Sequence, residues 1–201
     1  MSFHYIQVDR PLPDEDWRIA VHESGHAVVA VQSNGFLKRN SDDCLFNAIE
    51  IGPGEFGQVD FEHSPLNGEQ DESWSLDLLQ YWQTIYAAGA AAEHLVFGEI
   101  RMHGVRPKNW ATVDLNDRRD DMALHEKIGQ KVFANFGLAS EQFDEAVERG
   151  VEQMRKTSQK TVSVAEKLFD NSDKNSRLKS NKSLNYEQVC ELVGVVPSWC
   201  Q

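Results

Sequence analysis

The sequence lacks paired cysteines, and this absence excludes two common kinds of framework. Its three cysteines, Cys44, Cys190 and Cys200, lie far apart and form no C-x-x-C pair. A disulfide scaffold or a cysteine zinc site needs closely patterned cysteines, so neither is expected. This sparse cysteine usage suits a reducing compartment, and we expect a cytoplasmic location.

Basic residues are also scarce, with 20 Lys and Arg against 32 Asp and Glu, which leaves a net charge of −12. Affinity for nucleic acid depends on clustered Lys and Arg, so no nucleic-acid partner is expected. The G-x-x-x-x-G-K-[ST] phosphate-loop motif is missing too. The sequence therefore predicts no nucleotide-driven motor of its own.

Long apolar runs are missing as well. The longest run of small and apolar residues, 87–97, is interrupted by Glu93 and His94 and is shorter than the roughly 20 residues that a membrane-spanning helix needs. Residues 1–16 contain no basic segment followed by an apolar one, so they do not resemble a secretory signal. We expect neither a membrane span nor export.

The hydrophobic pattern predicts an α+β protein that is mainly α, folded as one domain over residues 1–201. Its core is expected at about 14–137, followed by a C-terminal helical part at about 140–193. Two short runs of alternating apolar and polar residues, joined by a glycine-rich turn, predict a β-hairpin within 44–61. The remaining pattern predicts a loop at 171–183 and helices at about 14–34, 73–97, 110–136, 140–170 and 185–194.

The segment HESGH at positions 22–26 matches H-E-x-x-H within the first of these helices. Residues four apart lie on the same helix face, so His22 and His26 can reach one Zn²⁺. Glu23 lies beside them, where it can take a proton from a zinc-activated water. The motif therefore predicts His22 and His26 as metal ligands and Glu23 as the general base.

A catalytic zinc needs a third protein ligand and one open position. Spacing alone does not choose this ligand. Glu93 can either approach the metal or hold a ligating imidazole from behind, and a rigid Asp near a helix start can point into a neighbouring helix. The candidates are Glu93, Asp114, Asp117, Asp120, Asp121, His94, His103 and His125.

Three segments, HESGHAVVAV, YAAGAAAEHLVFGEI and ATVDLNDRRDDMAL, follow one another in this order. Together they resemble the peptidase domain of the FtsH-type ATP-dependent zinc metalloproteases, over roughly residues 14–193. The resemblance implies one zinc per chain, with Asp114 as the third ligand and Glu93 supporting the site. Ala90 stands where that family has Arg, Thr112-Val113 replaces its Ser-Asn, and the ATPase module and membrane anchor are missing from this sequence.

Motif and resemblance together predict a zinc metallopeptidase that hydrolyses unfolded or short polypeptides, with a separate ATPase or a homo-oligomer as a possible partner. The exposed edge of the hairpin can either pair with an extended substrate or simply cover the helical core. One alternative function is a non-hydrolytic protein-interaction module that keeps the fold. Another is zinc-dependent hydrolysis of a non-peptide amide by the same residues.

Overall fold

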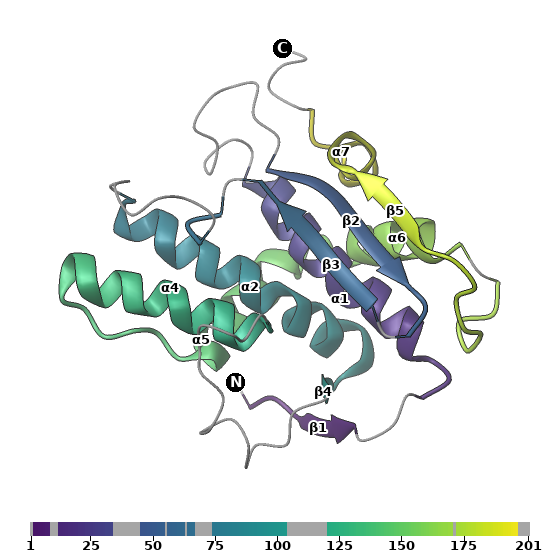
Figure 1. The fold of residues 1–201 in the computed structure, drawn as a ribbon, viewed down its shortest axis with the longest axis horizontal. Coiled ribbons are helices and arrows are strands. Elements are labelled where there is room, and N and C mark those ends of the chain that lie inside the picture. The colour runs from purple at the N-terminus through teal and green to yellow at the C-terminus, as the bar shows by residue number, and fades with distance from the viewer. Residues whose placement is uncertain are drawn as a thin grey trace.

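The structure is a computed structural model that describes residues 2–8, 12–33, 45–54, 56–62, 64–66, 74–103, 120–170 and 172–196. It is mainly helical with small sheets, which confirms the predicted fold class (Figure 1). The elements are β1 (Tyr5–Val8), α1 (Glu15–Gln32), β2 (Phe46–Gly52), β3 (Phe56–Phe61), α2 (Leu76–Phe97), β4 (Ile100–His103), α4 (Asp121–Phe136), α5 (Phe143–Met154), α6 (Ser158–Phe169), β5 (Lys182–Asn185) and α7 (Tyr186–Val193).

Helix α1 lies at the centre of the molecule. It begins after Asp14, with Glu15 and Asp16 in its first turn, where acidic side chains favour the positive end of the helix dipole. Strands β2 and β3 and helices α2 and α6 all pack against it (Figure 1). Its residues are therefore almost all buried, and polar side chains on it must find partners inside the protein.

Helix α2 crosses α1 very closely. It begins after Ser75, whose side chain accepts a hydrogen bond from the Leu78 backbone N–H, and ends at Gly98 in the left-handed conformation. A Cβ atom at Gly25 of α1 would lie 2.4 Å from the carbonyl oxygen of Ala88. Only a glycine permits this approach, so the small residues of both helices allow the tight crossing.

The sheet beside α1 has the strand order β3-β2-β5, with both pairings antiparallel. The predicted hairpin of β2 and β3 is confirmed, and Gly54 adopts a positive φ of 82° in its turn. The third strand differs from the sequence prediction, which places residues 182–183 in a loop. Strand β5 is short and polar apart from the buried Leu184, so it has too little alternation to be recognised.

Two predicted helices have different bounds. The helix expected over 140–170 is in fact α5 and α6, separated by residues 155–157. The break lets α5 pack on α2 while α6 packs on α1. The helix expected over 110–136 begins only at Asp121, because Asp120 is extended and caps it by accepting a hydrogen bond from the Ala123 backbone N–H. Residues 104–119 lie outside the described part of the chain.

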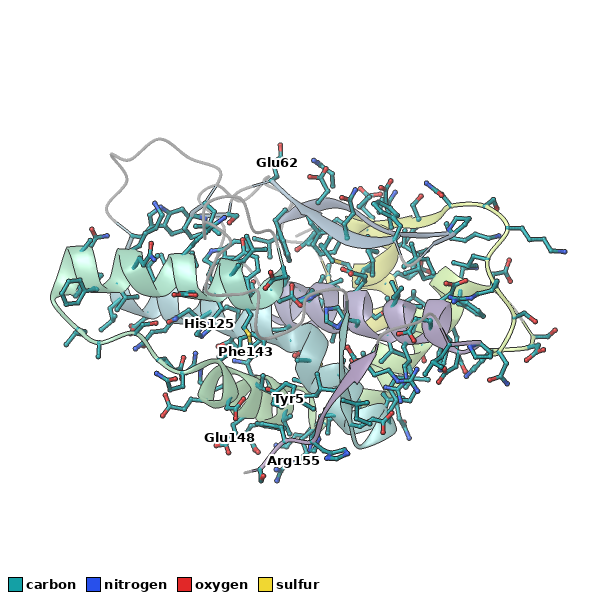
Figure 2. All side chains as sticks on the ribbon, turned by 60° about the horizontal axis from the view of Figure 1, so that its bottom comes forward. Tyr5, Glu62, His125, Phe143, Glu148 and Arg155 are labelled. Atoms are coloured by element: carbon teal, nitrogen blue, oxygen red, sulfur yellow. The ribbon has the colours of Figure 1, made fainter. Side chains whose placement is uncertain are left out.

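A parallel pairing of β1 with β4, also not predicted, joins the N-terminal segment to the end of α2. The Tyr5 hydroxyl donates a hydrogen bond to Asp144 of α5 over 2.7 Å, and Figure 2 shows Tyr5 close to that helix. Within the described ranges, none of the helices combines the length and the apolar character needed to cross a bilayer.

Candidate metal centre

Three side chains from two helices converge beside the sheet. His22 and His26 lie one turn apart on α1, with their ring centroids 4.9 Å apart. Asp121, the first residue of α4, places Oδ2 2.7 Å from His22 Nε2 and 3.2 Å from His26 Nε2. One ligand atom from each residue lies within 4.8 Å of the other two, so this group can hold a metal ion.

Helix α2 orients both imidazoles from behind. His26 Nδ1 donates a hydrogen bond to the carbonyl oxygen of Ile85 over 2.6 Å, and His22 Nδ1 donates to Glu93 over 2.7 Å. A neutral imidazole that donates through Nδ1 has its lone pair on Nε2, and Nε2 is the atom of each ring that faces Asp121. Glu93 thus orients the His22 ring and is not one of the three clustered residues.

Glu93 is in turn held by cationic and backbone groups. Its second carboxylate oxygen accepts a hydrogen bond from the Arg101 backbone N–H over 2.9 Å. The Arg18 guanidinium lies 3.7 Å from the same oxygen and binds Glu99 at 2.6 Å. Arg18 and Glu93 are 5% and 4% exposed, and buried groups of this kind need such partners to offset their loss of hydration.

Two glycines make room for the functional side chains. A Cβ atom at Gly89 of α2 would lie 2.4 Å from His22 Nε2, and one at Gly57 of β3 would lie 2.7 Å from a carboxylate oxygen of Glu23. Neither position can carry a side chain without moving these groups.

The cluster borders a cleft of about 570 Å³ between β3 and the start of α4. Glu23, His26 and Asp121 line it, so the motif carboxylate and two of the three candidate metal ligands border the same space. The remaining lining comes from residues 57–61 of β3 and from Ser64, Leu66, Tyr86, Leu124 and Lys127.

Burial and mutual charge shift the ionisation of these groups. Burial raises the pKa of Glu23, although the neighbouring histidines oppose this. Burial opposes protonation of His22 and His26, but the charge of Asp121 outweighs it and raises the pKa of both rings. The same histidines hold the pKa of Asp121 below its usual range. Protons and a metal ion therefore compete for the same nitrogen atoms.

The other candidates for the third ligand divide into two groups. Asp114, the ligand implied by the family resemblance, lies outside the described residues, as do Asp117 and the side chain of His103. Asp120 serves as the cap of α4, and His94 packs against Phe3. His125 packs edge-on against Phe143, as Figure 2 shows. Among the acids in the described part of the chain, Asp121 is the one that lies close to both histidines, and it is one candidate among several in the sequence.

No protein-family model matches the chain, and the search of curated proteins likewise finds no match.

Proposed function

We propose that this protein is a zinc-dependent metallopeptidase. The observation that supports the proposal best is that His22, His26 and Asp121 converge at one side of a cleft that Glu23 also lines. Three ligand atoms with a carboxylate beside them form the arrangement that hydrolytic zinc sites use.

The donor set suits zinc. Two imidazole nitrogens and one carboxylate oxygen are zinc ligands, and three protein ligands leave one position for water or substrate. The hydrogen bonds from Nδ1 to Ile85 and Glu93 orient each ring so that its Nε2 could bind the metal. A bound Zn²⁺ would supply Lewis acidity that brings the pKa of water close to neutrality. In this proposal Asp121 takes the role that the family resemblance assigned to Asp114.

Glu23 moves the proton in the proposed reaction. Its carboxylate accepts a proton from the attacking water as the water oxygen bonds to the peptide carbonyl carbon. When the tetrahedral centre collapses, the C–N bond breaks and Glu23 returns that proton to the departing amine. Burial raises the pKa of Glu23, which makes the carboxylate a better base for this step.

The cleft favours an extended polypeptide as the substrate. Strand β3 lines the cleft and is an edge strand of its sheet, since it pairs with β2 alone among the described strands. A strand edge offers backbone donors and acceptors to an extended chain. An unfolded or short polypeptide can adopt that conformation directly, whereas a folded substrate would need a separate ATPase partner.

Metal analysis combined with a peptidase assay tests the proposal. We expect about one zinc per chain, and Glu23→Gln should keep the zinc while losing at least about 100-fold in kcat, because the amide cannot accept the proton. Two results would contradict the proposal. The first is protein that contains iron in place of zinc, and the second is wild-type protein that binds zinc but cleaves no unfolded protein or peptide. The second result would favour the non-hydrolytic interaction module.

The third ligand is tested by two variants measured side by side. Asp121→Ala should weaken zinc binding strongly, while Asp114→Ala should leave the zinc dissociation constant close to that of the wild type. The reverse result would return the ligand role to Asp114.

A further inference from the structure

Two buried hydroxyl groups lie together in the wall of the same cleft. Tyr86 of α2 and Ser64, just after β3, are 5% and 3% exposed, and their oxygen atoms are 2.6 Å apart. Both residues line the cleft with Glu23, His26 and Asp121. The steps proposed above use neither of them.

The hydrogen atoms of this pair can be counted. The Ser64 oxygen accepts a hydrogen bond from the Leu66 backbone N–H over 3.1 Å. The two hydroxyls carry two hydrogen atoms, but only one of them can lie between the two oxygens. Neither hydroxyl has a further hydrogen-bond partner among the described residues, so within this part of the chain one hydrogen atom is left that can be donated into the cleft. A buried donor of this kind costs free energy unless something binds it.

The position of Tyr86 is fixed relative to the metal-binding rings. It directly follows Ile85, whose carbonyl oxygen holds His26. Its own ring packs against Trp82 at 5.8 Å and Phe61 at 6.2 Å between centroids. Aromatic packing on two sides keeps the hydroxyl from turning away when a substrate arrives, so the donor is preorganised.

We propose that the Tyr86–Ser64 pair donates a hydrogen bond to the carbonyl oxygen of the substrate as that oxygen gains negative charge. This inference rests on the proposed peptidase function and adds an electrophilic group to it. Burial raises the pKa of Tyr86 to about 12, so the phenol keeps its proton at neutral pH and can serve as a donor. A preorganised donor is most effective where charge develops in a dry site.

The experiment uses the zinc-loaded full chain and the variants Tyr86→Phe and Ser64→Ala. Tyr81→Phe is the matched control, because Tyr81 is on the same helix and donates to the Val29 carbonyl oxygen without lining the cleft. Two probes are titrated by calorimetry: a phosphinic peptide, whose anionic oxygen imitates the charged carbonyl oxygen, and a thiol peptide, which binds zinc through sulfur and has no such oxygen.

We expect Tyr86→Phe to lose about 10- to 100-fold in affinity for the phosphinic peptide and to keep its affinity for the thiol peptide. In the peptidase assay kcat should fall by roughly 10²- to 10³-fold with little change in KM, as for a donor that acts mainly in the transition state. Zinc content should match the wild type, and Ser64→Ala should give a smaller loss of the same kind.

The inference would be overturned if Tyr86→Phe lost the same affinity for both probes, or lost no affinity for either. A purely structural role of Tyr86 does not distinguish an oxyanion from a thiolate. The two probes also separate this inference from the peptidase proposal. A wild type that binds both probes but hydrolyses no peptide contradicts only the peptidase function, and the probe comparison still decides the role of Tyr86. A wild type that binds no zinc overturns both.

Discussion

Gly89 has no side chain, and the His22 imidazole occupies the space that one would fill. We predict that Gly89→Ala weakens zinc binding by roughly 10- to 100-fold, the range typical of changes around a ligating imidazole. The new methyl group would meet His22 Nε2 and turn the ring away from Asp121. Competition with a chromogenic chelator measures the dissociation constant.

Gly150→Ala is the control for Gly89→Ala. Gly150 lies on α5, and a Cβ atom there would lie 3.0 Å from Ala91 of α2, the helix that also carries Gly89. His22 is not among the atoms nearest to this Cβ. This variant should lose stability through crowding but keep its zinc affinity. Unchanged zinc affinity in Gly89→Ala would show that the ring tolerates the displacement.

His125 makes stability depend on pH. It is 3% exposed, and burial, with a contribution from the charge of Arg149, lowers its pKa to about 4. The unfolded chain has an ordinary histidine pKa of about 6.5, so between these values the unfolded state binds more protons. The free energy of unfolding should therefore fall by up to about 3 kcal/mol as pH drops from about 6.5 to about 4.

Urea denaturation of wild type and His125→Gln across this pH range measures that effect. Wild type should lose stability relative to the variant as the pH falls. The exposed His4 provides a control, and His4→Gln should follow the wild-type curve. Parallel curves for wild type and His125→Gln would show that His125 is not held neutral in the folded protein.

At the residue scale the sequence predicts well the residues of the centre that are close together in the chain, and poorly the one that is far away in the chain. His22, Glu23 and His26 lie within one helical turn, so helix geometry alone places them together. Asp121 comes from another helix, and nothing in its local pattern fixes where that helix packs. One signal was available: Asp120 is a good cap residue directly before it, which favours a helix start at 121.

Among the elements, the start of α4 determines where Asp121 lies. Asp120 accepts a hydrogen bond from the Ala123 backbone N–H and so fixes the first turn of α4. We predict that Asp120→Ala lowers the free energy of unfolding by about 1 kcal/mol and weakens zinc binding, because a frayed first turn no longer holds Asp121 in place. Urea denaturation and chelator competition measure the two effects.

Asp120→Asn is the matched variant, since asparagine caps a helix about as well as aspartate. It should keep both stability and zinc affinity. If it behaves like Asp120→Ala, the charge of Asp120 matters and the capping geometry does not.

The elements that the sequence predicts are those whose ends carry their own signals. Helix α2 has Ser75 at its start and Gly98 at its end, and the hairpin has a glycine turn. By contrast, the break at residues 155–157 contains neither Gly nor Pro, and it exists because α5 and α6 pack on different helices. Strand β5 likewise depends on pairing with β2, which is tertiary information.

On the scale of the whole molecule, the centre connects α1 to α4. A metal ion that binds only the folded chain stabilises it by an amount that grows with its concentration, about 2.7 kcal/mol when free zinc is 100 times the dissociation constant. We predict that the melting temperature rises with added zinc and falls with EDTA. Differential scanning calorimetry at several zinc concentrations checks this.

The double variant His22→Ala, His26→Ala supplies the control for the melting experiment. It should melt at the same temperature with zinc and with EDTA. A zinc-dependent shift that persists in this variant would place the stabilising metal elsewhere in the chain.

The separation of the ligands along the chain also sets the order in which the centre can form. His22 and Asp121 are 99 positions apart, and α2, which orients both imidazoles, lies between them in the sequence. Contacts between distant positions form slowly, because a long loop must close before they are gained. During synthesis on the ribosome, both histidines are added to the chain long before Asp121 is added and can pack beside them. The proposed metal capture by the complete centre would therefore come late in folding, after the packing of α1, α2 and α4.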